Sequence, residues 1–418
     1  AHKAALFTFH LSLITYIVMK ILVLNCGSSS IKYALYDMAD HSVITSGGIE
    51  KIGLPDSFIN VKLNGEKHRI MRPIEEHTAG VQFIFEVLTQ GEYAVLSDLN
   101  ELGAVGHRMV HGGERFNKSV LLTPEVMEAF AACNDLAPLH NPANIKGVNA
   151  VKALLPNIPQ VGVFDTAFHQ TMPDYAYMYA LPYEYYEKYR IRRYGFHGTS
   201  HRYISMRAAE MLGKDPKDLK IVTCHLGNGS SVAAVDGGKC LDTSMGLTPL
   251  EGIIMGTRCG SIDPAIIPLI MQKENMTPAQ VDEMMNKKSG ILGVSQKTSD
   301  NRDIENGAKA GDKRCQLIES MLVHQLVKLI GGYAAAMGGV DAVVFAGGIG
   351  ENNPHYRSRV AKKLAFLGAE IDEELNMKRG IEADLSKDPE HTKLHIMVIP
   401  TNEELMIARD TVELVNGK

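Results

Sequence analysis

The sequence predicts an α/β protein built around a duplicated unit. Apolar runs of strand length alternate with helical patterns through most of the 418 residues, which is typical of layered α/β folds. A strand, a short polar hairpin and a second strand occupy residues 21–37, and the same pattern returns at residues 221–236. In each copy a Gly-Ser-Ser turn leads into an apolar strand that ends in Asp. Two such units indicate a duplicated fold that holds one phosphorylated ligand from both sides.

The first hairpin has the side chains of a phosphate site. Residues 27–30 are small, so backbone N–H groups and hydroxyls can approach an anion, and Lys32 follows two residues later. Asn25 and these serines could also hold the water shell of a metal ion. A plain turn is the alternative, because Gly and Ser dominate turns for conformational reasons alone. The second hairpin and a third glycine-rich turn at residues 347–353 favour phosphate binding.

The other elements follow in chain order. A strand is expected at residues 104–110, and Asn141 as N-cap with Pro142 at the first helical position predicts a helix through residues 143–155. The remaining elements are expected to be strands at residues 159–164, 340–346 and 395–399, a long helix at residues 313–337, and a short helix at the C-terminus. Ligands bind at the carboxyl ends of strands in such sheets, where this chain places polar loops.

Composition excludes several classes of protein. The net charge of −5 argues against nucleic acid as the main partner, because a phosphate backbone requires a basic face. Six cysteines without C-x-x-C spacing indicate reduced thiols in a cytoplasmic protein, and neither a disulfide framework nor a zinc site. No serine lies in a nucleophile elbow, and no Cys–His pairing is expected.

Residues 1–18 are interpreted as a non-native or upstream extension. Residues 6–18 are mainly apolar, yet no small-x-small cleavage site follows, and a cut near Cys26 would destroy the first hairpin. The run is shorter than the ~20 apolar residues that span a bilayer, and Lys20 closes it. Met19 is positioned like a native start, so neither export nor a membrane partner is expected.

Two arginines and one histidine lie in glycine-rich surroundings. Arg108 and Arg258 each carry a planar fork that suits a carboxylate or a phosphate, whereas a surface ion pair is the ordinary alternative for either alone. His197 is followed by a glycine and could donate a hydrogen bond to a developing charge, although a lone histidine is more often structural. Its neighbours Arg193 and Ser200 favour a site.

Carboxylates follow two of the expected strands. Asp165 could orient an arginine, bind Mg²⁺ through water or act as a base. Glu403 and Glu404 could complete an octahedral Mg²⁺ site that keeps several waters, or simply occupy a helix first turn, where acids favour the dipole. Backbone cradles, Mg²⁺ carboxylates and Arg or His groups are the parts of a phosphoryl-transfer site.

The remaining histidines divide into three groups. His225 opens the second hairpin and is a candidate phosphate donor. His140 precedes a helix and is either catalytic or part of the helix entry, and the two interpretations are equally supported. The others, His107, His111 and His201, are interpreted as structural.

From residue 19 to its end the chain resembles the acetokinase family, the acetate kinases of the actin-like and sugar-kinase ATPase superfamily. The resemblance lies in residues 25–32, 106–114, 138–145, 164–173, 194–201, 225–231, 242–264, 346–353 and 401–411. It implies a duplicated actin-like (ribonuclease H-like) fold with the active site in the cleft between two domains. The first domain would comprise residues 19–167 and 402–418, and the second, nucleotide-binding domain residues 168–401. Cys259 departs from the pattern, because a small hydroxyl residue is commoner after the arginine.

The resemblance also implies a role for each set of site residues. The metal set is Asn25 and Glu403, and the catalytic set is Asp165, His197 and Arg258. The acid set is Arg108 with an apolar pocket of Val110, Leu139, Phe196 and Pro249. The nucleotide set is Lys32, His225, Leu226, Gly227, Asn228, Gly229, Asp300, Asn301, Arg302, Gly348, Ile349, Gly350, Glu351 and Asn352.

The implied reaction is reversible, Mg²⁺-dependent transfer of a phosphoryl group from ATP to acetate, giving acetyl phosphate and ADP. Mn²⁺ is a possible substitute, and a cytoplasmic homodimer is implied. A carboxylate is already ionised at pH 7, so we expect direct in-line transfer without a general base, with Asp165 as an orienting group. One methylene in an apolar pocket is worth only ~1–3 kcal/mol, so a propionate or short-chain acyl kinase is the alternative. An actin-like chaperone-type ATPase is a rival from another class, but it would not use Arg108 beside an apolar pocket.

Overall fold

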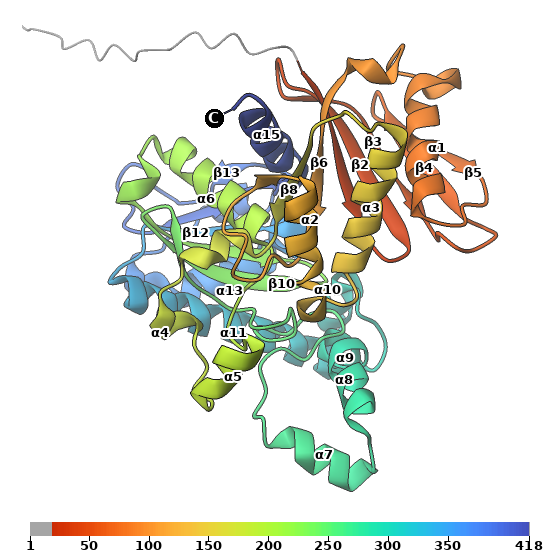
Figure 1. Ribbon diagram of the computed structural model, residues 1–418. Helices are drawn as coiled ribbons and strands as arrows, with labels where there is room; N and C mark the ends of the chain where they lie inside the picture. The colour runs from red at the N-terminus through yellow and green to blue at the C-terminus, as the bar shows by residue number, and fades with distance from the viewer. Residues whose placement is uncertain (1–18, 418) are drawn as a thin grey trace, which may run out of the picture.

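Two β-sheets organise the computed structural model, which describes residues 19–417 (Figure 1). The interpretation of residues 1–18 lies outside this range. The first sheet has the order β5-β4-β3-β2-β1-β6-β8-β7. Its strands are β1 (Lys20–Cys26), β2 (Ser30–Asp37), β3 (Ser42–Glu50), β4 (Phe58–Leu63), β5 (Glu66–Met71), β6 (Leu102–Met109), β7 (Val120–Leu121) and β8 (Gln160–Phe164).

The second sheet has the order β11-β10-β9-β12-β14-β13. Its strands are β9 (Lys220–Leu226), β10 (Ser230–Asp236), β11 (Lys239–Thr243), β12 (Ala342–Ala346), β13 (Ala383–Asp384) and β14 (His395–Val398). Five neighbouring strands repeat the first sheet, because β3-β2-β1-β6-β8 corresponds to β11-β10-β9-β12-β14 with the same directions. The predicted duplication of the α/β unit is therefore confirmed.

Fifteen α-helices surround the sheets of the described chain. Four accompany the first sheet, namely α1 (His77–Thr89), α2 (Pro124–Ala131), α3 (Asn141–Leu154) and the C-terminal α15 (Glu403–Val415). The others are α4 (Asp174–Tyr177), α5 (Tyr183–Tyr189), α6 (Gly198–Leu212), α7 (Ile266–Glu274), α8 (Pro278–Lys287), α9 (Gly290–Ser295), α10 (Asn301–Lys309), α11 (Lys313–Met337), α12 (Gly347–Asn352), α13 (Pro354–Lys363) and α14 (Glu373–Asn376). None of them, within residues 19–417, is long and apolar enough to span a bilayer.

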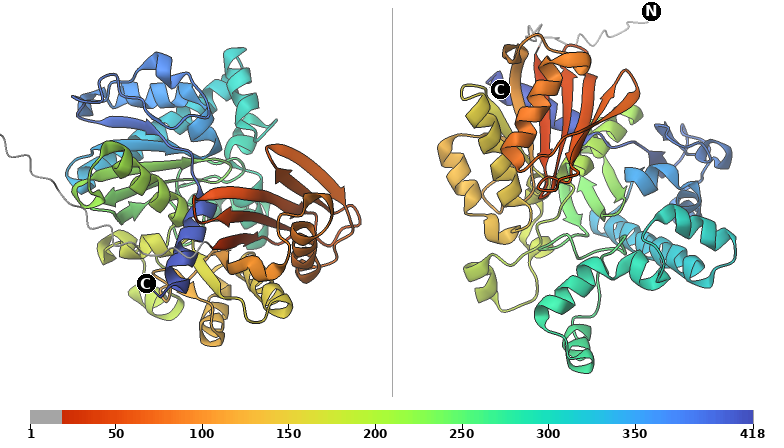
Figure 2. Two further views of the ribbon diagram at one scale, coloured as in Figure 1. Left: turned by 90° about the horizontal axis from the view of Figure 1, so that it is seen from above. Right: turned by 90° about the vertical axis from the view of Figure 1, so that its right-hand side faces the viewer.

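Helices cover both faces of the first sheet. On one face, side chains of α1 and α3 such as Ile84 and Val151 pack with Leu24 of β1. On the other face, Ile407 of α15 packs with Val23 of the same strand. Successive side chains of a strand point to opposite faces, which is why β1 is continuously apolar from Ile21 to Leu24. Figure 2 shows the dark blue α15 lying against the red first strands, so the two ends of the described chain share one core.

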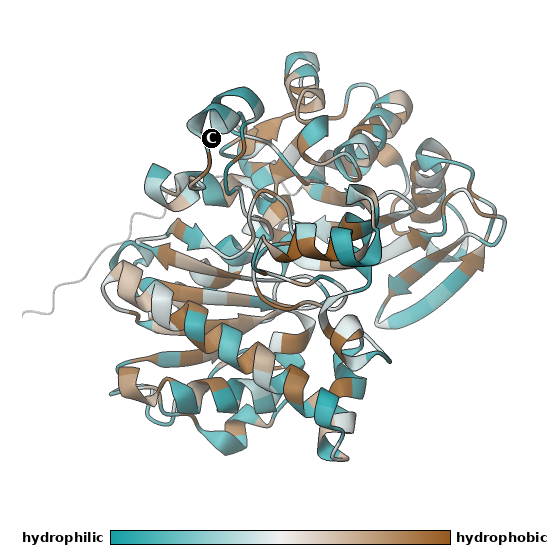
Figure 3. Ribbon diagram, turned by 90° about the horizontal axis from the view of Figure 1, so that it is seen from below, coloured by the Kyte–Doolittle hydropathy of each residue, from teal (hydrophilic) through white to brown (hydrophobic). Residues whose placement is uncertain are grey.

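The second sheet is covered in the same way. Leu326 of α11 packs with Val222 and Phe345 on one face. Ile204 of α6 packs with Val344 on the other face. In Figure 3 the strands of this half are mostly hydrophobic, whereas the helices outside them carry both hydrophilic and hydrophobic residues, as amphipathic covers require.

The inner helices of the two halves meet each other. Helix α6 contacts α15, and Arg202 of α6 forms an ion pair with Asp410 of α15 at 2.6 Å. The two sheets are therefore joined through a pair of packed helices, with the carboxyl ends of their central strands directed toward a common region.

Two local predictions are wrong. Residues 347–352 form helix α12, where the sequence predicts a glycine-rich turn. Asn141 is the first residue of α3 and not its N-cap, which is His140 without a side-chain cap bond. The Asn141 amide instead accepts from His111 N and donates to His111 O, at 3.1 and 3.0 Å. A tertiary contact replaces the expected local one.

Candidate active site

An arginine–carboxylate cluster lies at the carboxyl ends of the parallel strands of the first sheet. Asn25 is near the end of β1, Arg108 near the end of β6, Asp165 follows β8, and Glu403 begins α15. Strands β1, β6 and β8 are adjacent and parallel, so their carboxyl ends meet at one edge. The fold thus brings together four predicted site residues that are far apart in the sequence.

Arg108 is the centre of this cluster. Its guanidinium donates to both oxygens of Asp165, from Nε at 3.1 Å and from Nη2 at 2.5 Å. Its Nη1 lies 3.4 Å from the amide oxygen of Asn25, and its Nε lies 3.8 Å from a carboxylate oxygen of Glu403. The bidentate pair fixes the plane of the guanidinium, which leaves Nη1 directed away from Asp165. This orientation suits a second planar anion.

Burial raises the pKa of both carboxyl groups. Asp165 is 1% exposed, and desolvation raises its pKa to about 6 despite the opposing charge of Arg108. Desolvation also raises the pKa of Glu403, again against the effect of Arg108. Buried Asp165 and partly buried Glu403 therefore share one guanidinium.

A second cluster surrounds His197, at the start of α6. This residue has φ 56°, a left-handed conformation that is strained for a non-glycine residue. The next residue is Gly198, where a Cβ atom would lie 2.2 Å from the carbonyl oxygen of Asp165. The Gly198 N–H donates to that oxygen at 2.8 Å. The backbone of the histidine is thus locked directly to the arginine–carboxylate cluster.

His197 and Arg258 border the same small space. A methyl group on Gly229 would lie 3.4 Å from both His197 Nε2 and Arg258 Nη1. Arg258 Nη1 donates to the carbonyl of Pro249 at 3.1 Å, and the His197 ring stacks on His225 with centroids 4.2 Å apart. Desolvation keeps the pKa of His197 well below its usual value and lowers that of His225 to about 4. The second hairpin thus faces neutral imidazoles and a guanidinium.

An apolar cluster includes Val110, two residues after Arg108, and its Met255 sulfur lies 3.6 Å from Nη1 of Arg258. Val110 and Phe196, both expected in the acid pocket, pack with three residues that sequence reasoning missed, namely Ala137, Met245 and Met255. Leu139 lies outside this cluster and is 74% exposed, so the structure does not bring it to the expected position. The alternation of apolar residues indicates that Met245 and Met255 are buried. It does not indicate that they pack with Val110 and Phe196, which are far away in the sequence.

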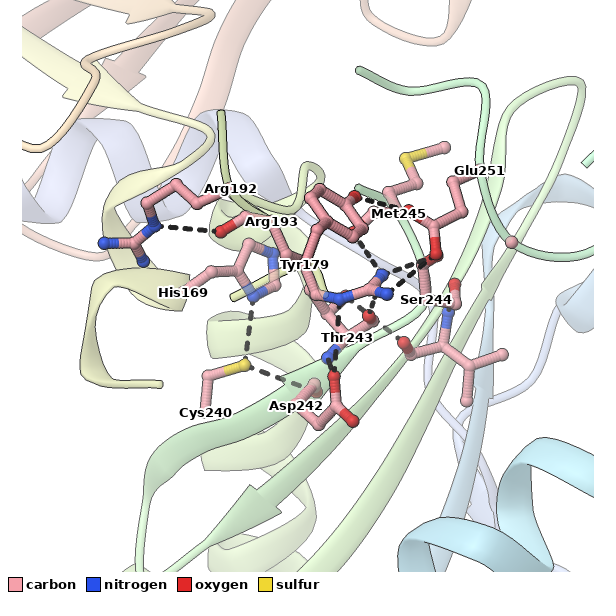
Figure 4. A network of polar contacts seen from close by, with 12 residues as sticks. His169, Tyr179, Arg192, Arg193, Cys240, Asp242, Thr243, Ser244, Met245 and Glu251 are labelled. Carbon is pink, nitrogen blue, oxygen red and sulfur yellow. Dashed lines mark hydrogen bonds and ion pairs between the residues drawn. The ribbon is translucent and has the colours of Figure 1, made fainter. Parts of the chain in front are cut away.

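Arg193 holds the loop that carries Met245 and Pro249. Its guanidinium donates to the carbonyls of Thr243 at 2.9 Å and Met245 at 3.1 Å, and it pairs with Glu251 at 2.7 Å (Figure 4). Tyr179 donates to the same carboxylate at 2.5 Å. The sequence names Arg193 only as a neighbour of His197, and in the structure this side chain supports the loop from beneath.

A groove of about 700 Å³ opens beside the second hairpin. It brings together most of the predicted nucleotide set, namely Gly227, Asn228, Asp300, Asn301, Arg302, Gly348, Ile349 and Asn352, and adds Ser299, Glu305, Asn353 and Arg379. A Cβ atom on Gly348 would have no other atom within 4 Å, so the space above this glycine is open and a flat ring can approach its backbone.

Not all of the nucleotide set lines this groove. Leu226 and Gly350 are buried beneath it, and His225 belongs to the cluster around His197. Glu351 accepts from the backbone N–H groups of Gly347 at 2.9 Å and Thr401 at 3.2 Å, so it holds the loop together. Lys32 lies exposed on β2, opposite Asn25 in the strand register.

The histidines interpreted as structural are buried and bonded within the protein. His107 bonds to Gln160 at 2.7 Å, and His201 bonds to Thr223 and Ser231, both at 2.7 Å. Burial, with the charges of Arg108 and Arg258, lowers the pKa of His140, which places this histidine near the site.

One cysteine lies close to a histidine in the structure. His169 Nδ1 lies 3.1 Å from the sulfur of Cys240. Burial raises the pKa of this thiol well above its usual value, so it remains protonated and is not a nucleophile.

Two hairpins of small residues, a guanidinium held by a carboxylate and buried imidazoles thus lie at the carboxyl ends of the central strands. A sequence model of the Acetokinase family matches residues 20–409. The chain belongs to the Acetokinase family. It is 60% identical over 399 residues to the acetate kinase of Phocaeicola vulgatus, which covers 95% of this chain and 100% of that relative. The acetate kinase of Clostridioides difficile is 55% identical over the same length, with the same coverage.

Solved structures of this family have the same fold. The acetate kinase of Porphyromonas gingivalis superposes with a TM-score of 0.92 at 50% identity, covering 95% of this chain and 99% of that one. A propionate kinase from Francisella tularensis superposes with a TM-score of 0.86 at 41% identity, covering 94% and 98%. The acetokinase fold expected from the sequence, with its duplicated α/β unit, is therefore confirmed.

Proposed function

We propose that this chain reversibly transfers a phosphoryl group between ATP and acetate, forming acetyl phosphate and ADP. The observation that carries the proposal is the Arg108 guanidinium, held in its plane by both oxygens of Asp165 beside the apolar cluster of Val110 and Phe196. A planar donor next to a small apolar surface matches a short carboxylic acid. Relatives named acetate kinase at 55–60% identity support the same reaction.

The acid would be bound and oriented by Arg108. Acetate is ionised at neutral pH, so its oxygen can attack phosphorus without a base. We therefore assign Asp165 to holding the guanidinium, a role that its bidentate contact supports. The β-branched side chain of Val110 narrows the apolar side and favours acetate over longer acids, by the ~1–3 kcal/mol that one methylene is worth.

The transferred group would pass between His197 and Arg258. These side chains border one space next to Gly229, which has no side chain to obstruct it. During in-line transfer charge spreads over the three equatorial oxygens of the phosphoryl group, and preorganised donors stabilise it. We propose direct transfer without a phosphorylated enzyme intermediate.

The arginine–carboxylate cluster fits a hard divalent cation. Asn25, Asp165 and Glu403 offer oxygen donors, and their excess negative charge would be relieved by Mg²⁺ or by Mn²⁺ in its place. Within residues 19–417 no group of three or more His, Cys, Asp or Glu side chains is placed to hold a metal, so the ion would keep several waters. When bound, it neutralises charge on the nucleotide phosphates.

The nucleotide would occupy the groove beside the second hairpin, with Lys32 reaching its phosphates from the first hairpin.

We propose two domains, residues 19–167 with 402–418 and residues 168–401, because α15 packs on the first sheet. We further propose a cytoplasmic homodimer, as the family resemblance implies.

The test is an acyl phosphate trap. The protein is incubated with ATP and Mg²⁺ and with acetate, propionate or butyrate, and acyl hydroxamate is measured after adding hydroxylamine. We expect the highest kcat/KM with acetate. Formation of ADP without any hydroxamate would support the chaperone-type ATPase instead, and a competent phosphorylated Asp or Glu would contradict direct transfer.

A further inference from the structure

A line of buried polar side chains runs away from His197 into the second sheet. His197 Nδ1 lies 2.9 Å from the Ser231 hydroxyl, which lies 2.7 Å from His201 Nε2. His201 Nδ1 lies 2.7 Å from the hydroxyl of Thr223. Ser231, His201 and Thr223 are each 0% exposed, so water does not compete for these bonds.

The proton count of this line restricts it to two states. A neutral imidazole has one N–H and one acceptor nitrogen, and a hydroxyl donates once. Ser231 stands between two imidazoles, so it donates to one and accepts from the other. The protons therefore all point toward His197 or all point away from it.

Thr223 bonds differently in the two states. Its hydroxyl lies 2.7 Å from His201 Nδ1 in both, as donor in one state and as acceptor in the other, and it can donate to the Ala233 carbonyl at 3.4 Å only in the second. These distances do not choose the state, so the choice depends on what His197 Nε2 must bond to. When Thr223 donates to His201, the latter donates from Nε2 to Ser231, and Ser231 donates to His197 Nδ1.

We propose that Thr223, His201 and Ser231 form a hydrogen-bond relay that keeps the ring proton of His197 on Nε2, facing the transferred phosphoryl group. The inference rests on the proposed function for the identity of that group. The oxygens of the phosphoryl group being transferred accept hydrogen bonds and do not donate them. With the proton on Nδ1, His197 would instead direct the lone pair of Nε2 toward this negative charge. The relay residues position His197 and do not touch the substrate.

The surroundings keep the relay uncharged. His197 faces His225, His201, Arg108 and Arg258, and burial together with these groups lowers its pKa well below the usual value. Burial also lowers the pKa of His201, next to His169 and His225. A protonated imidazole in this chain of hydrogen bonds would be repelled by these neighbouring groups. The histidines therefore stay neutral, and only the nitrogen that carries the ring proton can differ.

The experiment compares two buried threonines of the same sheet. Thr223→Val removes the end of the relay, whereas Thr243→Val removes a hydroxyl that only bonds to the Val232 carbonyl at 3.2 Å. We expect Thr223→Val to lower kcat about tenfold with little change in either KM, Thr223→Ser to restore it, and Thr243→Val to leave kcat as it was.

The tautomer itself is read from ¹⁵N NMR of the histidine rings in the full chain, assigned with a His197→Gln variant. We expect a protonated Nε2 in the original protein and a shift of proton density to Nδ1 in Thr223→Val. A protonated Nδ1 in the original protein, or equal losses of kcat in Thr223→Val and Thr243→Val, would overturn the proposal. Because the NMR signal needs no substrate, a failed acyl phosphate assay would count against the proposed function and leave the relay separately testable.

Discussion

The two hairpins place their functional side chains at the same positions and use them in different ways. In the first, Asn25 and Lys32 are cross-strand neighbours; in the second, His225 and Ser231 are. Both strand pairs also end on a Lys–Asp pair, Lys20 with Asp37 and Lys220 with Asp236. Lys32 is exposed, whereas Ser231 is fully buried. The two hairpins thus share one backbone geometry but differ in burial. We expect exposed Lys32 to bind an anion and buried Ser231 to support His197 from inside the protein.

The largest effect should come from the side chain that the second hairpin supports. His197→Ala should lower kcat by about 10²–10³-fold, because a preorganised donor to a developing charge is lost. KM for ATP and acetate should change little. The measurement is the rate of acyl hydroxamate formation at saturating substrates. A loss confined to KM would contradict the division of labour between the hairpins.

Replacement of Lys32, the exposed side chain of the first hairpin, should have a smaller effect and should act on ATP binding. Lys32→Ala should lower kcat/KM for ATP by roughly 10–100-fold, the equivalent of about 1.5–3 kcal/mol for a charged hydrogen bond. Lys62→Ala, on β4 of the same sheet, is the matched control and should leave it unchanged. A fall in kcat with unchanged KM would mean that both hairpins serve the chemical step.

The hairpin tips should differ in stability. Ser230 is buried, and its hydroxyl accepts from Gly227 N at 3.1 Å and donates to Gly227 O at 2.9 Å. Ser230→Ala should lower the free energy of unfolding by about 1–3 kcal/mol, because the glycine loses a partner. Ser29→Ala, at the exposed first tip, should change it by less than about 0.5 kcal/mol. Urea unfolding measures the free energy of unfolding of both variants. Equal losses would contradict the expectation that the buried tip contributes more to stability than the exposed one.

The last prediction concerns stability in acid. Burial lowers the pKa of His107 to about 4, while an unfolded histidine titrates near ~6.5. The unfolded state therefore binds the proton first as the pH falls, so stability is full above ~6.5 and is lost between there and about 4. His107→Gln should reduce this slope by up to ~1.4 kcal/mol per pH unit. Urea unfolding at pH 7, 6 and 5 measures it, and parallel curves for both proteins would contradict the prediction.

Local patterns predicted both hairpins and the central strands of each sheet, because apolar periodicity and small polar turns lie in adjacent residues. Most residues of the groove were expected from the family resemblance. Contacts across the fold were not predictable in this way. Asn141 looks like a helix cap in sequence, but its amide bonds to the backbone of His111. Arg193 is only a neighbour of His197 in sequence, and its role in holding the loop before Glu251 appears only in the fold. The exposure of Leu139 depends on how α3 is entered, which no local pattern reveals.

Helix α15 also affects how the protein folds during its synthesis. Ile407 and its neighbours in α15 complete the core of the sheet that begins the chain, and Glu403 at its start completes the arginine–carboxylate cluster. During synthesis the earlier strands emerge long before this helix does. A nascent chain therefore exposes one apolar face of its first sheet until α15 has been synthesised. We expect activity to appear only after residues 403–415 have left the ribosome, and a stop codon before residue 403 to yield an aggregation-prone chain.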